Sequence, residues 1–331
     1  MLLSVIVPCF NEEAVLRSTH ERLMDMLREL PHLSFEIIYV DDGSRDQTAA
    51  TLAELQDIND EVRVLRLSRN FGQQVAVSAG LEHASGDAVV LIDSDLQDPP
   101  EVIPEMVQLW LEGNDVVYGT RISREGESQF KLWTAKAFYR VINRLSETPI
   151  PLDSGDFRLM DRKVVDVLLA MPERDRFLRG MVSWVGFRQV ALPYSRASRS
   201  AGESKYSMFK MLSFAMDGIM SFSLLPLKLA VWTGIVVIWI ALAGLLAVFG
   251  MMFGLYDLQI GLGSASLFVA VLFMGGVQLV FLGIIGEYLG RIYKEVKRRP
   301  LYAVAERLGF ENSERAKSAS QGQGRAMIVG L

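Results

Sequence analysis

The stretch VVLIDSDLQDPP, at residues 89–100, begins as an apolar run and then turns acidic. Three aspartates, Asp93, Asp95 and Asp98, lie within six residues around Gln97. A solvated turn explains Asp98 and the two prolines after it, but it explains Asp93 and Asp95 poorly. Carboxylates this close raise one another's pKa unless a cation lies among them, and a divalent ion with oxygen ligands is the usual remedy. The stretch therefore predicts a buried strand that ends at a metal site.

Short β-rich runs alternate with longer segments of helical period up to Gly119. The runs are LSVIVP, FEIIYV, VRVLRL, DAVVLID and DVVYG. This alternation predicts βαβ units on a mostly parallel sheet with helices on both faces, a Rossmann-like α/β domain that we assign to residues 1–200. Ligands bind at the carboxyl ends of the strands in such sheets. Because PCFNEE, DDGSRD, SRNFG and DSDLQD follow the first four strands, we expect these segments to converge on one crevice.

Two long segments without Asp, Glu, Lys or Arg follow at residues 229–256 and 258–286. Each is longer than the roughly 20 residues that a helix needs to cross the hydrocarbon core of a membrane. A buried core helix of this length is the weaker alternative. We therefore expect an all-α membrane domain of two transmembrane helices at residues 229–286.

Basic residues flank the two predicted spans and are absent from their connection. Lys205, Lys210 and Lys228 precede the first span, and five Lys or Arg residues between positions 291 and 299 follow the second. The positive-inside rule then predicts a multi-pass protein of the inner (plasma) membrane with both ends of the chain in the cytoplasm. The N-terminal segment has no basic leader and turns polar at Asn11, so we interpret it as the first strand of a cytoplasmic domain.

Amphipathic segments are expected on both sides of the spans. Residues 201–228 contain a predicted interfacial helix at 208–225, for which a soluble core helix is the alternative. Residues 287–310 form a basic amphipathic segment that we expect to lie on the anionic cytoplasmic leaflet. Residues 311–331 are rich in Ser, Gly, Gln and Ala, which predicts a disordered tail. Glycines within the spans allow close helix packing, so we expect a homo-oligomer, with a tetramer as a guess.

Two adjacent aspartates, Asp41 and Asp42, end the second predicted strand in VDDGSRD. Neighbouring residues of a strand point to opposite faces, so one of them can face the crevice while the other braces the turn. A carboxylate at this place suits an imide N–H or a ribose hydroxyl better than a phosphate, which it would repel. We favour Asp42 for that contact, with Asp41 as the alternative.

Asp93 and Asp95 form an Asp-x-Asp pair, and Gln97 can add a neutral oxygen. Mg²⁺ and Mn²⁺ prefer hard oxygen donors and leave room for substrate phosphates. Such pairs occur by chance in many chains, but a position at the end of an apolar strand gives this pair more weight. The pair resembles the Asp-x-Asp arrangement that chelates a divalent ion on the diphosphate of a nucleotide sugar, where Mg²⁺ or Mn²⁺ would neutralise the leaving group.

Six motifs together carry a resemblance to a known family. They are SVIVPCFNEE, IIYVDDGSRDQT, LSRNFGQQVAVSAG, LIDSDLQDPPE, YGTR and SGDFRLMDR. In this order they resemble the family 2 glycosyltransferases with the GT-A fold. The narrower resemblance is to the polyprenyl-phosphate glycosyltransferases, which include dolichyl-phosphate mannose synthases and bacterial bactoprenol glucosyltransferases. It covers residues 3–310, including both spans.

The resemblance implies roles for individual residues at three places. The residues of the nucleotide-sugar site would be Pro8, Phe10, Glu12, Val40, Asp42, Asp93, Ser94 and Arg199. Many relatives have tyrosine where this chain has Phe10, so a contact from that hydroxyl is absent. The metal ligands would be Asp95, Gln97 and Asp93, and the acceptor phosphate would contact Arg121, Ser204 and Lys205. For Arg199 and Lys205, anchoring to anionic lipid is an alternative role.

Asp156 of SGDFR occupies the position of the catalytic carboxylate, and Asp95 is the second candidate catalytic residue. A lipid phosphate is already ionised near neutral pH, so a general base would contribute less than it does for an alcohol acceptor. An ordinary buried ion pair between Asp156 and Arg158 is an equal alternative to a proton-transfer role.

The resemblance implies an inverting transfer of a hexose to undecaprenyl phosphate on the cytoplasmic leaflet, with UDP-glucose as the favoured donor. GDP-mannose, UDP-galactose and a UDP-4-amino-arabinose type of donor are alternatives, because hydroxyl contacts decide between them. A processive polysaccharide synthase is disfavoured by two spans and the absence of a QxxRW motif. A noncatalytic nucleotide-sugar sensor or a flippase subunit is disfavoured by the intact acidic motifs. We expect no nucleic-acid partner.

Overall fold

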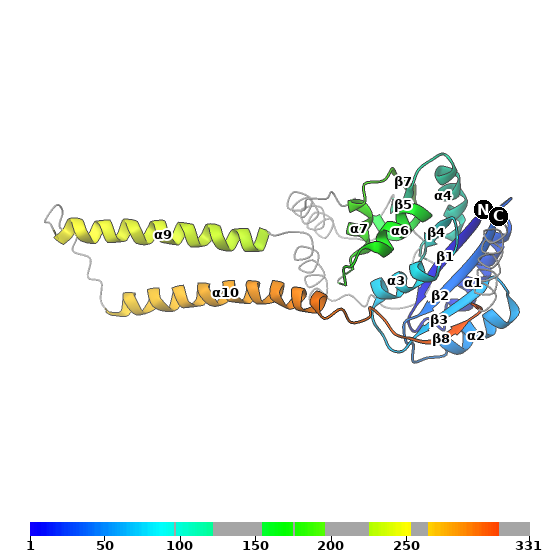
Figure 1. Ribbon diagram of the computed structural model, residues 1–331, viewed down its shortest axis with the longest axis horizontal. Coiled ribbons are helices and arrows are strands. Elements are labelled where there is room, and N and C mark those ends of the chain that lie inside the picture. Colours follow the sequence, from blue (N-terminus) through cyan, green and yellow to red (C-terminus); the bar gives the residue numbers. More distant parts are fainter. Residues whose placement is uncertain (96, 122–153, 175, 196–224, 253–263, 311–331) are drawn as a thin grey trace, which may run out of the picture. The chain divides into compact units, whose positions relative to one another are not determined.

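The computed structural model describes residues 1–95, 97–121, 154–174, 176–195, 225–252 and 264–310 (Figure 1). The chain forms two compact units. The first is an α/β unit that contains most of the first 205 residues and also the chain from Pro300 onward. The second is a helical unit that ends at Arg299.

The α/β unit is built on one sheet of eight strands among the described residues, in the order β7-β5-β6-β4-β1-β2-β3-β8. The strands are β1 (Leu2–Cys9), β2 (Ser34–Asp41), β3 (Val62–Leu67), β4 (Ala88–Leu91), β5 (Val116–Arg121), β6 (Ser154–Asp161), β7 (Gln189–Tyr194) and β8 (Val304–Leu308). β4, β1, β2 and β3 are parallel to one another, as the alternating pattern predicts. β6 runs antiparallel to both β4 and β5, and β8 runs antiparallel to β3, so the sheet is mixed.

Helices cover both faces of this sheet (Figure 1). The first apolar core contains residues of α1 (Leu16–Arg28), α2 (Thr48–Ile58) and α4 (Ile103–Leu111), which follows the short 3-10 helix η1 (Pro100–Val102). The second contains residues of α3 (Gln73–His83), α6 (Arg162–Ala170) and α7 (Leu178–Trp184). Val5 and Val7 of β1 pack in the first core and Ile6 packs in the second, because successive strand residues point to opposite faces. Burial on both faces explains the apolar runs at residues 5–7 of β1 and 37–40 of β2 and the wholly apolar β4.

β6 brings a distant part of the chain beside β4. Leu91 pairs with Arg158 in the antiparallel ladder between these strands. If this register continues by two residues, it sets Asp93, just after β4, opposite Asp156 of β6. The pairing of β6 therefore determines which side chains meet at the carboxyl end of β4.

β8 lies in the segment 287–310, which the sequence analysis assigns to the membrane surface. The chain instead continues α10 to Val296 and then pairs Val304–Leu308 with β3. Next to the strand, the hydroxyl of Tyr302 donates to Glu82 of α3 at 2.5 Å. The expectation for this segment needs correction from residue 304 onward, because an open edge of β3 offers backbone partners that a membrane surface does not.

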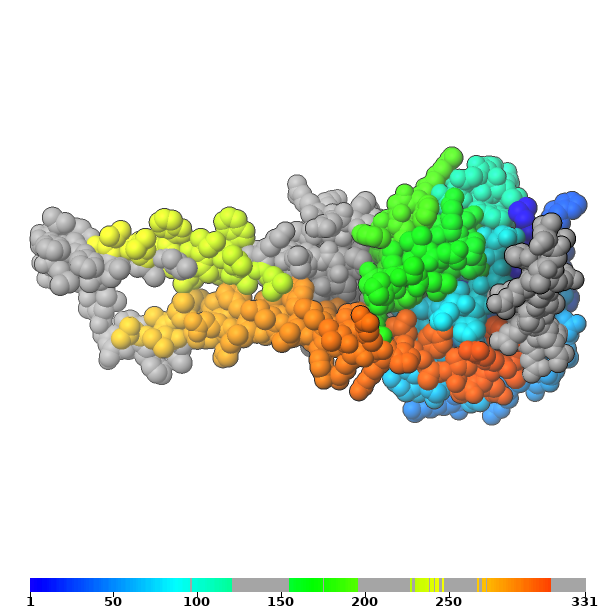
Figure 2. Space-filling view, in the orientation of Figure 1, coloured from blue at the N-terminus to red at the C-terminus, as the bar shows by residue number. Residues whose placement is uncertain are grey.

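The helical unit contains two long helices, α9 (Leu225–Met252) and α10 (Ser264–Val296), which contact each other. Large apolar side chains on them are exposed, including Trp239 at 66% and Phe273 at 67%. Figure 2 shows the yellow-green surface of α9 along the orange surface of α10.

One helix within the described residues is long and apolar enough to cross a membrane, over Phe273–Val296 of α10. The arrangement with two spans stays a prediction. The predicted interfacial helix lies outside the described residues except for Leu225, and the predicted tail at 311–331 lies outside them completely.

Candidate active site

The loops that follow β1 and β2 are joined by hydrogen bonds at the carboxyl edge of the sheet. The backbone N–H of Asn11 donates to the Ser44 hydroxyl at 3.0 Å, and the backbone N–H of Arg45 donates to Asn11 Oδ1 at 2.9 Å. Asn11 has a φ of 56°, which asparagine tolerates better than most residues. The backbone N–H of Glu12 donates to Thr48 Oγ1 at 2.9 Å. These bonds hold the two loops in a fixed arrangement.

Asp41 and Asp42 both brace loops. Asp41 is fully buried, and its Oδ1 accepts the backbone N–H of Ser44 at 2.9 Å. The two carboxylate oxygens of Asp42 accept the backbone N–H groups of Phe71 at 2.7 Å and Gly72 at 2.8 Å. Burial raises the pKa of Asp42 above its ordinary value, although these two donors favour the ionised form. A nucleoside contact from Asp42, or from Asp41, stays a prediction.

Gly43 allows the loops after β2 and β3 to approach each other closely. Its φ is +67°, and a Cβ at this position would lie 2.4 Å from the carbonyl carbon of Arg69. Any other residue would meet both backbone strain and atomic overlap here. The edge of the site is therefore built by direct backbone contact between two loops.

The side chains assigned to the nucleoside pocket lie at different depths. Phe10, which follows β1, is 38% exposed, and Pro8 and Glu12 are partly buried. Val40 is fully buried in the second core. Its side chain therefore lies beneath the surface of the site rather than on it.

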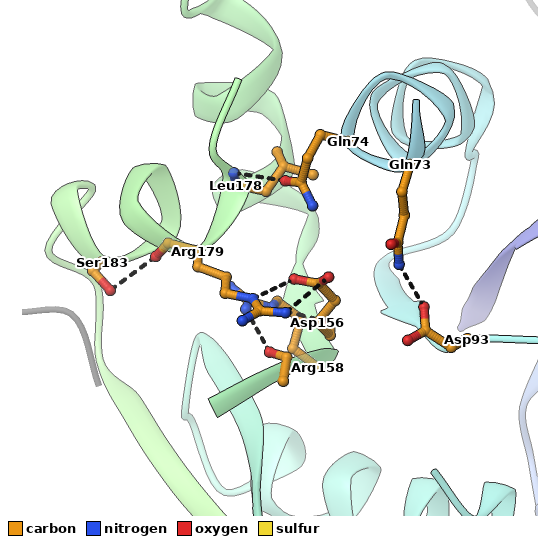
Figure 3. Close-up of polar contacts among 9 residues, drawn as sticks. Gln73, Gln74, Asp93, Asp156, Arg158, Leu178, Arg179 and Ser183 are labelled. Atoms are coloured by element: carbon orange, nitrogen blue, oxygen red, sulfur yellow. Dashed lines mark hydrogen bonds and ion pairs between the residues drawn. The ribbon is translucent and has the colours of Figure 1, made fainter. Parts of the chain in front are cut away.

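Asp93 lies at the centre of a cluster of acidic side chains. Gln73, at the start of α3, donates from Nε2 to Asp93 Oδ1 at 2.8 Å (Figure 3). Burial and the negative charges of three neighbouring aspartates raise the pKa of Asp93 to about 7. In decreasing order of effect, these neighbours are Asp156, Asp98 and Asp95. The effect of Asp156 agrees with the register between β4 and β6.

Asp156 forms an ion pair, but its partner is not the one that the sequence indicates. Arg179 of α7 donates from Nε to Asp156 Oδ1 at 2.7 Å and from Nη2 to Oδ2 at 3.2 Å (Figure 3). Arg158 instead donates to the backbone carbonyls of Gly155 at 2.9 Å and Asp156 at 3.3 Å. Burial lowers the pKa of the Arg158 guanidinium to about 10. An ion pair between Asp156 and Arg158 is therefore wrong as an expectation, because Arg158 turns to the backbone.

The remaining acidic residues of the stretch have different surroundings. Asp98 is 1% exposed and accepts a hydrogen bond from the Tyr194 hydroxyl, so the interpretation of Asp98 as a solvated turn residue is wrong. Asp95 Oδ1 accepts the backbone N–H of Gln97 at 3.2 Å, and both residues are partly exposed. Ser94 is 5% exposed. Asp93, Asp95 and Gln97 are therefore the partly exposed polar side chains among the described residues of the stretch.

These residues fit a divalent cation that takes further ligands from a substrate. Counting only described residues, the four carboxylates and the two guanidinium groups of Arg158 and Arg179 sum to a charge of −2 when all are ionised. Among the described residues, no three His, Cys, Asp or Glu side chains are arranged to hold a metal ion by themselves. Mg²⁺ commonly binds through one or two carboxylates and substrate phosphates, which matches this donor set.

Sequence reasoning missed Gln73 and Arg179. Arg179 is 23 residues from Asp156 along the chain, and no local spacing links the two. Four predicted phosphate-binding side chains lie outside the described part of the chain. Arg121 ends β5 with its side chain outside the described residues, and Arg199, Ser204 and Lys205 lie outside them altogether.

Comparison with known proteins identifies the family. Glycosyl transferase family 2 matches residues 4–169. An uncharacterized glycosyltransferase of Synechocystis sp. is 48% identical over 312 residues, which cover 93% of this chain and 96% of that protein. The SfII prophage-derived bactoprenol glucosyl transferase of Shigella flexneri is 42% identical over 307 residues, which cover 92% of this chain and 97% of that protein.

Among solved structures, glucosyl-3-phosphoglycerate synthase from Mycobacterium tuberculosis, in complex with phosphoglyceric acid, is similar with a TM-score of 0.45 and 23% identity. The match covers 66% of this chain and 77% of that one. The family match and the two relatives confirm the resemblance of the six sequence motifs. The chain belongs to glycosyl transferase family 2, and it is a glycosyltransferase.

Proposed function

We propose that the protein transfers glucose from UDP-glucose to undecaprenyl phosphate, or a similar polyprenyl phosphate, with inversion at the anomeric carbon. The observation that carries the proposal is the acidic cluster, in which Asp93 lies close to Asp156 at the carboxyl end of β4. Relatives at 40% to 42% identity are named bactoprenol glucosyl transferases, which supports glucose and a lipid acceptor. GDP-mannose, UDP-galactose and a UDP-4-amino-arabinose type of donor are the alternatives within the same reaction.

The donor would lie over the carboxyl ends of β1, β2 and β4. Asp93, Asp95 and Gln97 would hold Mg²⁺ or Mn²⁺, and the bound ion would neutralise charge on the diphosphate. The nucleoside and ribose would contact Phe10 and Asp42, and the other residues proposed to line the donor site are Pro8, Glu12, Ser94 and Arg199, with the buried side chain of Val40 supporting them from beneath.

In the transfer itself, an oxygen of the lipid phosphate forms a bond to the anomeric carbon while the bond from that carbon to the diphosphate oxygen breaks. The electron pair of the broken bond leaves with the nucleoside diphosphate. The lipid phosphate is already ionised, so no proton has to be removed at this step. Asp156 would orient the reacting groups, and Arg121, Ser204 and Lys205 would hold the acceptor phosphate.

The acceptor's chemistry requires a membrane, and α9 and α10 would supply the anchor. We assign both helices as spans, with both ends of the chain in the cytoplasm and the protein in the inner membrane. The glycines of these helices support a homo-oligomer, with a tetramer as the specific expectation. Crosslinking in native membranes that yields monomers alone would contradict the oligomer.

The test is transfer of radiolabelled sugar into the lipid fraction by the purified full-length protein in detergent. A panel of nucleotide sugars with undecaprenyl phosphate, each with Mn²⁺, Mg²⁺ or EDTA, identifies the donor and the metal. We expect a labelled lipid product from UDP-glucose that depends on divalent metal. If UDP-glucose binds but no nucleotide sugar yields a lipid product, the protein is a sensor and the proposed transfer is wrong.

A further inference from the structure

Arg179 of α7 makes a two-point contact with a carboxylate in the candidate site. Its Nε lies 2.7 Å from Asp156 Oδ1, and its Nη2 lies 3.2 Å from Oδ2. A contact of this kind fixes the orientation of the carboxylate as well as its distance. The side chain of Arg179 is 24% exposed and that of Asp156 is 13% exposed, so the pair is largely shielded from water.

Two consecutive glutamines at the start of α3, Gln73 and Gln74, link this helix to Asp93 and to α7 (Figure 3). Gln73 donates to Asp93 Oδ1 at 2.8 Å. Gln74 Oε1 accepts the backbone N–H of Leu178 at 3.0 Å, in the residue next to Arg179. The start of α3 therefore holds Asp93 directly and positions α7, which in turn holds Asp156.

The pairing of β4 with β6 brings Asp156 towards Asp93, so the fixed contact at Asp156 sets how the two carboxyl groups face each other. Among its charged neighbours, Asp156 raises the pKa of Asp93 the most, and Arg179 acts in the opposite direction. Like charges at short range push side chains apart unless a cation or a fixed contact restrains them. Among the described residues, Arg179 provides a positive charge beside Asp156 and also a fixed contact with it.

We propose that Arg179 is a positioning residue for sugar transfer, which holds Asp156 in its working orientation through the two-point contact. This inference rests on the proposed function. Arg179 acts through Asp156, and the Gln74 contact with α7 contributes to the same arrangement.

The test compares Arg179→Ala, Arg179→Lys, Asp156→Asn and the Arg179→Ala/Asp156→Asn double variant in the full chain. Misplacing a reacting group costs on the order of 100-fold in rate, so Arg179→Ala should lower kcat by about that factor while the donor KM changes less than about threefold. Arg179→Lys keeps the charge but not the forked geometry, and kcat should recover in part. In the Asp156→Asn background, adding Arg179→Ala should lower kcat by less than about threefold, because the carboxylate that Arg179 holds is already altered.

Two outcomes would overturn the inference. A higher donor KM with kcat retained, or losses that multiply in the double variant, would mean that Arg179 contacts the substrate directly. Arg176→Ala is the matched control, because Arg176 donates to the backbone carbonyls of Met171 and Glu173 instead of to the cluster. It should keep kcat within about twofold.

Gln74→Ala keeps both partners of the forked contact, Arg179 and Asp156, and provides a second variant if Arg179→Ala does not fold. It should lower kcat in the same direction by a smaller factor, with the donor KM retained. A Gln74→Ala variant with wild-type kcat would contradict the part assigned to Gln74 and α7.

Binding of Mn²⁺ alone, without a nucleotide, gives a readout that does not depend on activity. Removing the positive charge of Arg179 from the cluster should tighten Mn²⁺ binding by about threefold or more, whereas Arg176→Ala should leave it unchanged. Equal Mn²⁺ affinity in wild type and Arg179→Ala would contradict the place of Arg179 in the cluster. Absence of lipid product from the wild type would instead count against the proposed function.

Discussion

Replacing Gly43 by alanine tests how closely the loops after β2 and β3 approach each other. The left-handed conformation at φ +67° costs an L-residue such as alanine about 1–2 kcal/mol. The new Cβ would also lie 2.4 Å from the carbonyl carbon of Arg69 and 2.7 Å from the backbone nitrogen of Asn70. Overpacking of this kind costs about 1–3 kcal/mol. We therefore expect Gly43→Ala to lower the free energy of unfolding by roughly 2–5 kcal/mol.

Gly113→Ala is the matched control for this prediction, because Gly113 has a φ of +93° and an added Cβ there would have no atom within 4 Å. Its free energy of unfolding should fall only by the cost of the left-handed backbone conformation, roughly 1–2 kcal/mol. Thermal unfolding of the full chain in detergent measures the difference, at about 2–4 °C per kcal/mol for a domain of this size. Equal shifts for the two variants would refute the close contact at Arg69.

Three further predictions concern the acidic cluster. Tyr194→Phe removes a donor to the buried carboxylate of Asp98, so the thermal midpoint should fall by the equivalent of about 1–3 kcal/mol, and an unchanged midpoint would contradict the contact. Asp95→Asn should lower kcat/KM by about 100-fold, and EDTA should abolish wild-type activity until Mn²⁺ is added back; lipid product that survives EDTA would contradict the metal assignment. The pKa of Asp93 in the folded protein is about 7, above its ordinary 3.8, so its contribution to stability is present at low pH and is lost as the pH rises through 7. Thermal stability of the metal-free wild type should therefore fall more steeply than that of Asp93→Asn between about pH 4 and 7, and parallel curves would show that Asp93 is not the group responsible.

Local patterns predict the central strands and the loops that follow them. β1 to β4 each combine an apolar run with a polar segment at the carboxyl end, and parallel βαβ units bring those ends to one edge. The pairing of β6 and β8 depends instead on long-range register, which a single sequence does not contain. Residues 304–308 come shortly after the basic end of α10 at Val296, so composition favours a membrane surface for them instead of a sheet edge.

Side-chain partners in the site were harder to predict than the strands. The sequence indicates that Asp93 and Asp95 need compensation, and the raised pKa of Asp93 agrees with that argument. Turn statistics favour solvent for Asp98, because they contain no information about Tyr194, which is 96 residues away. Arg158 is two residues from Asp156 and is the obvious partner by proximity, yet alternation along β6 does not determine where a long side chain turns.

The return of the chain to β3 after the second long helix has a practical consequence for shortened versions of the protein. A chain cut at the end of α10 would leave the N–H and C=O groups of β3 without the pairing that β8 supplies. Such an edge can recruit strands from other molecules, so the cut protein would tend to aggregate even though every residue of the acidic cluster is still present. Versions meant for crystallisation or assays should therefore keep the chain through Phe310, whose side chain is 9% exposed.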